Sequence, residues 1–294
     1  MGVKDRQREE ARRRMEQRLA ERAAQTAKRR RRNAIVGAVV GVIAVVIAGT
    51  WAVTALGGKS HKHGLPSDRT FCNYNQPTGE KPARNVGLPP VTALKKGKVD
   101  IALNTNQGNI GLQLDRSKAP CTANSFGYLA VNKYFDNTPC HRLTTENIYV
   151  LQCGDPTGTG TGGPGYQMPE ENKPKADPNM AGGLTLYPKG TLAMAKAQAA
   201  GSTGSQFFLV YKDTYLTPDY TVAGRITSGM DVIEKIAAGG VKAGGDTPGD
   251  GAPNLTVNIL TATATGDGVA EYKPAPASSA STPATPSPSA SAGQ

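Results

Sequence analysis

The stretch V99-D-I-A-L-N-T-N-Q-G-N-I-G-L-Q-L-D115 alternates apolar and polar residues on both sides of a short polar centre. Apolar side chains recur at every second position, first at Val99, Ile101 and Leu103 and then at Ile110, Leu112 and Leu114. This period of two is typical of strands with one buried face, and the Gln107-Gly108 pair between the runs favours a turn. The stretch therefore predicts an antiparallel hairpin that opens a β-rich domain.

Further short strand-like runs follow this hairpin. They are 138–143, 148–153, 191–195, 206–210, 221–226 and 255–260. Two helices are expected among them, one after Pro120 with Phe126, Leu129 and Ala130 at helical spacing, and one over 230–237. About eight strands with two helices predict a mainly β fold, a closed eight-stranded antiparallel β-barrel capped by two helices, over residues 98–265.

The residues before this domain are divided by charge. Residues 1–32 carry thirteen Lys and Arg against five Asp and Glu, so they hold +8 of the net charge of +11. Residues 34–56 then form an uncharged run of twenty-three residues, enough for a single transmembrane helix. A signal peptide is the rival interpretation, but this run is longer than a usual signal core. The cluster Lys28 to Arg32 keeps residues 1–33, a basic and helical segment, in the cytoplasm by the positive-inside rule.

The sequence therefore predicts a cell-membrane protein with its main domain outside and contacts to membrane lipid. A helix lying on the anionic inner leaflet explains the basic leader better than nucleic-acid binding does. Residues 57–97 are expected to form an extracellular stalk, and 266–294 a disordered tail rich in Pro, Ala, Ser and Thr.

The four cysteines all follow the apolar run, where oxidising conditions permit disulfides. Three pairings are possible, and we favour Cys121 with Cys140 and Cys72 with Cys153. No C-x-x-C spacing or neighbouring His supports a metal site, so no metal is expected.

The sequence lacks the residue patterns that most classes of enzyme need. The G-x-G-x-x-G match at Gly158 is followed by prolines instead of a helix, and there is no P-loop or G-x-S-x-G motif. His141 is the only histidine in the domain, and it is expected to make structural hydrogen bonds. An arginine beside amides and apolar rings remains, a set suited to binding a neutral peptide without a cofactor.

Five motifs carry a resemblance to a known family. They are HR at 141–142, YVLQCGD at 149–155, GTGTGGPGY at 158–166, GTLAMA at 190–195 and GSQFF at 204–208. In these motifs residues 99–260 resemble a cyclophilin-type peptidyl-prolyl cis-trans isomerase, and with the leader and apolar run the chain is similar to membrane-anchored bacterial forms.

The resemblance implies an enzyme that isomerises X-Pro bonds of exported polypeptides and assists their folding, with cyclosporin-like compounds as candidate ligands. It places the catalytic arginine at Arg142. Substrate-binding positions fall on Tyr149, Val150, Gln152, Ala195, Lys196, Ala197, Gln206, Phe208, Tyr215, Leu216 and Tyr220. Phe207 is assigned to the core by alternation with Phe208.

Two departures from the family pattern favour a second hypothesis. Lys196 stands where Asn is common, and the turn between Arg142 and Tyr149 is two residues longer than usual. They would suit a scaffold that holds proline-containing segments with little turnover.

Overall fold

The computed structural model describes residues 65–242 and 247–272. The predicted cytoplasmic segment, membrane span and most of the predicted tail lie outside these residues. Within the described ranges no helix has the length and apolar character needed to cross a membrane.

The predicted hairpin is confirmed as β3 (Lys98–Thr105) and β4 (Gly108–Asp115). Alternate residues of both strands are buried, as the period of two requires. The register joins Val99 to Leu114 and Thr105 to Gly108, which leaves Asn106 and Gln107 as a two-residue turn. The Thr105 hydroxyl donates to the carbonyl of Gly108 at 2.6 Å and fastens the turn.

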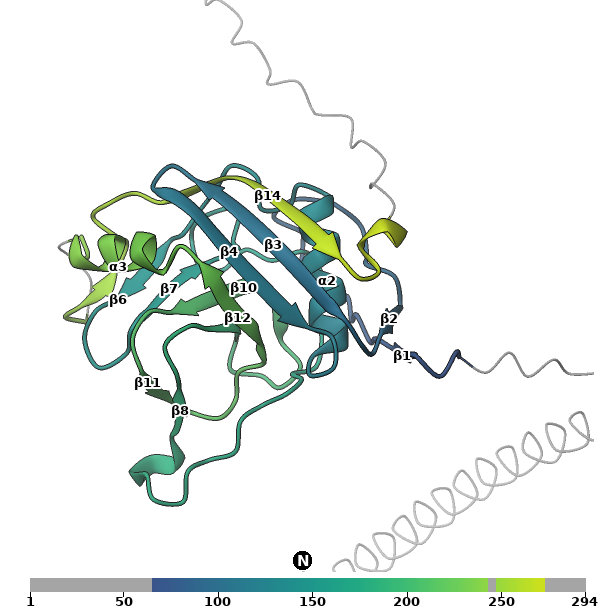
Figure 1. Cartoon of the computed structure of the whole chain (residues 1–294), viewed down its shortest axis with the longest axis horizontal. Coiled ribbons are helices and arrows are strands. Elements are labelled where there is room, and N and C mark those ends of the chain that lie inside the picture. Colours follow the sequence, from purple (N-terminus) through teal and green to yellow (C-terminus); the bar gives the residue numbers. More distant parts are fainter. Residues whose placement is uncertain (1–64, 243–246, 273–294) are drawn as a thin grey trace, which may run out of the picture. The chain divides into compact units, whose positions relative to one another are not determined.

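Ten strands form one curled sheet in the order β13-β6-β7-β10-β9-β12-β4-β3-β14-β5 (Figure 1). Besides the hairpin they are β5 (Thr138–Pro139), β6 (Arg142–Thr144), β7 (Val150–Cys153), β9 (Thr191–Lys196), β10 (Thr203–Val210), β12 (Val222–Ser228), β13 (Asp250–Gly251) and β14 (Asn258–Gly266). Two smaller sheets pair β1 (Arg69–Phe71) with β2 (Thr92–Leu94) and β8 (Thr185–Tyr187) with β11 (Thr214–Leu216).

The sheet is open, so the expected closed eight-stranded barrel is wrong. The stretch predicted as one strand, 138–143, is divided at Cys140 and His141 into β5 and β6. β5 pairs with β14, whereas β6 pairs with β7 and β13. No ladder among the described strands joins the two ends of the sheet, and each of the edge strands β5 and β13 is two residues long with one strand partner.

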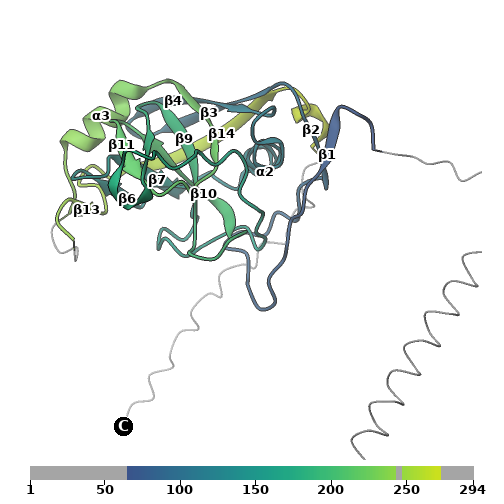
Figure 2. The ribbon, with the colours of Figure 1, turned by 90° about the horizontal axis from the view of Figure 1, so that it is seen from below.

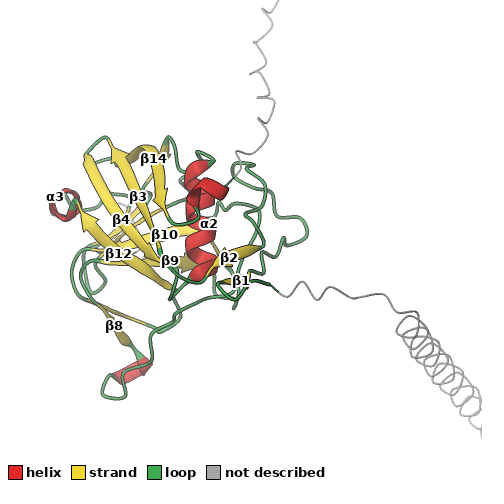
Figure 3. Cartoon of the chain, turned by 45° about the vertical axis from the view of Figure 1, so that its right-hand side comes forward, coloured by secondary structure: helices red, strands yellow, loops and turns green. Residues whose placement is uncertain are grey.

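Both expected helices are present. Helix α2 (Pro120–Val131) begins with Pro120 in its first turn, where the missing N–H costs nothing. Helix α3 (Met230–Ala238) buries Ile233 and Ile236. The two helices lie at opposite ends of the curled sheet (Figures 1 and 3). Two single-turn 3-10 helices, η1 (Ala181–Gly183) and η2 (Val269–Glu271), complete the described elements.

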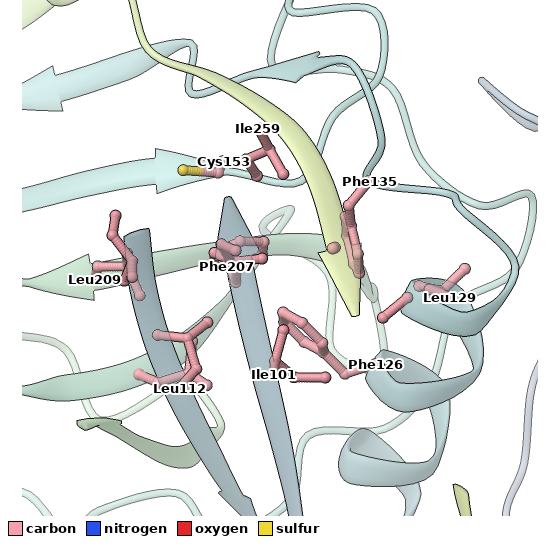
Figure 4. Close-up of a cluster of buried hydrophobic side chains, with 14 of the residues drawn as sticks. Ile101, Leu112, Phe126, Leu129, Phe135, Cys153, Phe207, Leu209 and Ile259 are labelled. Atoms are coloured by element: carbon pink, nitrogen blue, oxygen red, sulfur yellow. The ribbon is translucent and has the colours of Figure 1, made fainter. Parts of the chain in front are cut away.

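The main core fills the concave side of the sheet and is closed by α2. Phe207 is fully buried there, as the alternation predicts, with its ring centroid 5.0 Å from that of Phe126 and 5.7 Å from that of Phe135 (Figure 4). Ile101 and Leu112 of the hairpin belong to the same cluster. These packed rings anchor β10 in the main core.

The segment from residue 65 to 97 differs from the expected stalk. It contributes β1 and β2, which lie beside α2 (Figure 2), and buried residues such as Tyr74 and Val86. Arg84 donates to the backbone carbonyls of Tyr134 and Asp136 at 3.0 and 2.8 Å. These residues therefore belong to the compact unit that begins at Leu65.

The first residues of the predicted tail are also packed. The buried Arg116 donates to the Asp267 carbonyl at 2.9 Å and to the Tyr272 hydroxyl at 2.8 Å. The compact unit thus includes Asp267 and Tyr272 of the predicted tail.

The disulfide pairing that we favoured is wrong. Cys72 is bonded to Cys121 and Cys140 to Cys153. The first bond ties the 65–97 segment to the start of α2. The second joins Cys140, one of the two residues between β5 and β6, to Cys153, the last residue of β7, and their Cα atoms are 4.0 Å apart.

Candidate active site

A cavity of about 160 Å³ opens on the face of the sheet opposite the main core. Eight of the predicted site residues line it, together with Ile148: Arg142, Val150, Gln152, Ala195, Lys196, Phe208, Leu216 and Tyr220. One wall carries a guanidinium and an amide, and the other is apolar. The cavity therefore suits a small ring with a hydrogen-bond acceptor at its edge.

The strand register explains why these residues meet. Arg142 on β6 lies directly opposite Gln152 on β7, and Gln152 lies opposite Phe208 on β10, which in turn lies opposite Ala193 on β9. Directly paired residues point to the same face of a sheet, and so do residues two apart on one strand. The same face therefore also receives Ala195, two residues beyond Ala193.

Arg142 is held by two neighbours. Its Nε and Nη2 donate to the two carboxylate oxygens of Asp250 at 2.8 and 2.7 Å, and its Nη1 donates to Oε1 of Gln152 at 3.3 Å. The ion pair with Asp250 raises the pKa of Arg142 further above its usual value, and hydrogen bonding to Arg142 lowers the pKa of Asp250. Both groups are therefore charged at neutral pH.

The amides of Gln152 and Gln206 extend this polar row. Gln152 Nε2 donates to Gln206 Oε1 at 2.8 Å, and Gln206 Nε2 donates to the carbonyls of Gly160 and Gly162 at 2.8 and 3.0 Å. The glycine-rich loop that supplies these carbonyls closes around Asp155, whose carboxylate accepts from the backbone N–H groups of both glycines at 2.8 and 3.0 Å. These hydrogen bonds thus fix the orientations of the Gln152 and Gln206 side-chain amides between Arg142 and the loop.

The apolar wall is built from aromatic rings. Phe208 is 4% exposed, and its ring stands perpendicular to that of Tyr220 with centroids 5.4 Å apart. Tyr187 lies behind both rings, and its hydroxyl donates to the Thr217 carbonyl at 3.1 Å. Leu216 packs against the same cluster.

A second cavity, of about 340 Å³, shares Gln152, Ala195 and Lys196 with the first. Ala197 and Gln206 line this second cavity, as does Glu80 from the 65–97 segment. The Lys196 ammonium donates to the carbonyls of Ala197 and Ala199 at 2.9 and 3.2 Å. The Lys196 ammonium is therefore engaged by backbone carbonyls of its own loop.

Two predicted residues line neither cavity. Tyr149 is next to Val150 on the chain and so faces the other way, where its ring packs against Tyr211 at 6.0 Å and the Lys212 ammonium lies 4.3 Å above it. Ile148 takes a place in the wall instead. Tyr215 is 43% exposed on β11.

His141 does not make the structural hydrogen bonds that we expected. Both ring nitrogens are buried and have no hydrogen-bond partner among the described residues. Burial lowers the pKa of this imidazole, which keeps it neutral at pH 7. Its neighbour Arg142 carries the charge at this end of β6.

Asp250 was missed by the sequence reasoning. It is 108 residues from Arg142, in a stretch rich in Gly and Pro. The only local signal was an acidic residue before Gly251, which by itself indicates a turn.

Comparison with known proteins agrees with this geometry. Residues 98–264 match the family model described as cyclophilin type peptidyl-prolyl cis-trans isomerase/CLD. A probable peptidyl-prolyl cis-trans isomerase B of Mycobacterium leprae is 44% identical over 208 residues, which cover 66% of this chain and 69% of that protein. A protein of Mycobacterium tuberculosis with the same description is 45% identical over 196 residues, 64% of this chain and 62% of that protein.

A crystal structure of a Cryptosporidium parvum cyclophilin type isomerase, determined in the presence of the dipeptide Ala-Pro, is 24% identical with a TM-score of 0.43, covering 56% of this chain and 97% of that chain. The family match spans more than half of the chain, residues of four of the five motifs line the cavity beside Arg142, and residues of the fifth, 158–166, line the second cavity. The chain belongs to the cyclophilin family and is a cyclophilin-type peptidyl-prolyl cis-trans isomerase.

Proposed function

We propose that Arg142 is the catalytic residue and that the cavity beside it holds the proline ring of a polypeptide substrate. The observation that carries this proposal is the place of Arg142 in the wall of the same cavity as Phe208 and Leu216. A volume of about 160 Å³ with one apolar wall suits a ring as small as that of proline.

The reaction needs stabilisation of a twisted amide. Rotation about a peptide bond faces a barrier of ~18–20 kcal/mol because resonance is lost, whereas the cis and trans forms of X-Pro differ by only ~0.5–1 kcal/mol. In the twisted state the prolyl nitrogen regains its lone pair and becomes an acceptor. A donor placed on that nitrogen therefore stabilises the transition state more than the ground states.

A guanidinium fits this role because it stays protonated and presents a rigid set of donors. One charge-assisted hydrogen bond contributes ~1.5–3 kcal/mol, so Arg142 supplies only part of the acceleration. The remainder comes from fixing the ring against Phe208 and from the ordered amides of Gln152 and Gln206, which hold the groups on either side of the bond. Neither acid-base chemistry nor a covalent intermediate is needed.

We further propose that the enzyme acts on exported proteins from a membrane anchor. Residues 34–56 are long and uncharged enough to span a bilayer, and Lys28 to Arg32 precede them. All four cysteines of the chain form disulfides, which favours an oxidising compartment for the domain. The clients would be unfolded segments with slow X-Pro bonds outside the membrane.

The test of catalysis compares the full-length chain with Arg142→Ala. Cis-trans exchange of an Ala-Pro peptide is measured by NMR line broadening, and peptide binding by titration. We expect the variant to bind peptide and to lose at least about tenfold in exchange rate. Peptide binding by the wild type without exchange would favour the scaffold hypothesis instead.

The test of location is protease treatment of intact cells. Cleavage of the isomerase domain from outside, with the first 33 residues protected, is the expected result. Protection of the domain in intact cells would contradict export.

A further inference from the structure

We propose that Asp250 is a positioning residue for catalysis, which orients the Arg142 guanidinium toward the substrate nitrogen. The inference depends on the role proposed above for Arg142. It assigns a function to a carboxylate in the two-residue strand β13, far along the chain from the motifs that surround the cavity.

The contact is made on one side of the guanidinium. Asp250 accepts from Nε and Nη2 at 2.8 and 2.7 Å, and Gln152 accepts from Nη1 at 3.3 Å. A guanidinium has five N–H groups in one plane, so these three bonds leave two, one on Nη1 and one on Nη2, without a partner among the described residues. Asp250 and Gln152 together fix the plane of the guanidinium and leave its end free for an acceptor in the cavity.

The backbone places the carboxylate for this contact. Asp250 lies opposite Thr144 on β6, and Thr144 is two residues from Arg142. Asp250 and Arg142 therefore point to the same face of the sheet as diagonal neighbours, a spacing that a long side chain spans. The Thr145 N–H donates to the Gly249 carbonyl at 2.7 Å and anchors β13 just before the carboxylate.

Gly249 makes this anchor possible. Its φ of +68° is in the left-handed region, and a Cβ there would lie 2.7 Å from Cγ of Glu146. Glycine suits this position, because another residue would be strained at this φ and would crowd the side chain of Glu146.

The Arg142 side chain needs a hydrogen-bond partner to hold one rotamer, because packing does not confine it. Its side chain is 42% exposed, and it extends from a strand of only three residues. A long side chain in such a place samples several rotamers, and only those that direct the free N–H groups into the cavity can act on the substrate. The pair with Asp250 restricts these rotamers, although it also neutralises part of the positive charge.

Orientation and charge make opposite predictions for removal of Asp250. If orientation matters more, Asp250→Ala slows exchange. If the positive charge of the guanidinium matters more, the same variant speeds exchange, because Arg142 is no longer paired.

The experiment uses the full-length chain and the Ala-Pro exchange assay with Asp250→Ala, Asp250→Asn and Asp250→Glu. Glu234→Ala is the matched control, because Glu234 forms an exposed ion pair with Lys189 outside both cavities. We expect Asp250→Ala to reduce kcat by roughly ten- to a hundredfold. KM should change little, since the apolar wall is intact. Asp250→Glu should retain a higher rate than Asp250→Ala, and the rate of Asp250→Asn should fall between those of these two variants. The control should match the wild type.

Two further measurements isolate positioning from folding. The side-chain 1H–15N signal of Arg142 Nε should shift in Asp250→Ala while backbone signals of α2 and β10 stay in place. In the Arg142→Ala background, Asp250→Ala should cause no additional loss of rate, because a positioning residue has no effect once its target is gone.

The outcomes separate this inference from the proposed function. If Arg142→Ala leaves the exchange rate unchanged, Arg142 is not the catalytic residue. If Arg142→Ala slows exchange but Asp250→Ala matches or exceeds the wild type, only the role of Asp250 is refuted. A further loss in the double variant would refute it as well.

Discussion

Removal of the Cys140–Cys153 disulfide should destabilise the protein and loosen β6 and β7, the strands that carry Arg142 and Gln152. We consider the double substitution Cys140→Ala and Cys153→Ala, which leaves no polar group in place of two buried sulfurs. The cysteines are 13 residues apart. In the chain-entropy account, a bond that closes a loop of this length contributes about 3 kcal/mol to the free energy of unfolding. The loop contains Arg142 and Gln152, so their pairing should also become less regular.

The Cys72–Cys121 bond provides the matched comparison. It spans 49 residues, and the same relation gives about 4 kcal/mol for Cys72→Ala with Cys121→Ala. This bond lies away from the cavity lining, so we expect its loss to lower stability without a comparable loss of exchange rate.

Urea unfolding followed by circular dichroism measures both free energies, and the Ala-Pro exchange assay in native buffer measures the catalytic effect. Treatment with a reductant under unfolding conditions should remove the difference between wild type and each variant. A change below about 1 kcal/mol for the Cys140–Cys153 pair would refute the loop-closure reasoning. Equal exchange rates in both double variants would refute the local effect on Arg142.

Three other substitutions test separate parts of the structure. Phe208→Ala should lower the free energy of unfolding by about 3–5 kcal/mol and abolish exchange, as measured by urea unfolding and the peptide assay. Gly224→Ala should cost about 3 kcal/mol in the same unfolding assay, because the new Cβ would lie 2.0 Å from the Gln113 carbonyl oxygen. His141 has a folded-state pKa below its unfolded value of 6.5, so the unfolded chain binds more protons and stability should fall as the pH drops below 6.5. Urea midpoints at pH 7.5 and pH 5 should show this decrease in the wild type but not in His141→Gln.

The fold was predictable where a local period decides it. The alternation in 99–115 identified β3 and β4, and alternation also separated Phe207, which packs in the main core, from Phe208, which packs beside the cavity. These patterns depend on which face of one element is buried. The periodicity of a strand does not, however, reveal what its edges pair with, so the division of 138–143 and the open sheet were not predicted.

The site was predictable only in part, for a similar reason. Family motifs predicted Arg142, Gln152 and Phe208 as site residues, and all three line the same cavity. The contribution of Glu80 to the second cavity and the contact of Asp250 with Arg142 depend on segments that meet only after folding. Disulfide pairing fails as a prediction on the same ground, because three pairings of four cysteines differ in spatial distance and not in sequence pattern.

The arrangement of charges explains how an exposed arginine can act as a fixed donor. The hydrogen-bonded row from Arg142 through Gln152 and Gln206 has a carboxylate at each end, Asp250 at the guanidinium and Asp155 inside the glycine-rich loop. The pKa of each carboxylate is below its usual value of 3.8, that of Asp250 through its bonds to Arg142 and that of Asp155 through bonds from Thr157 and the loop backbone, which outweigh its burial. Both ends therefore stay charged down to about pH 4. Since no group in the row titrates near neutrality, the charges of Arg142, Asp250 and Asp155 should stay constant between about pH 5 and 8. Any pH dependence in the orientation of the proposed catalytic donor over that range should therefore come from His141, whose imidazole interacts with Asp155 and Arg142, and should be absent in His141→Gln.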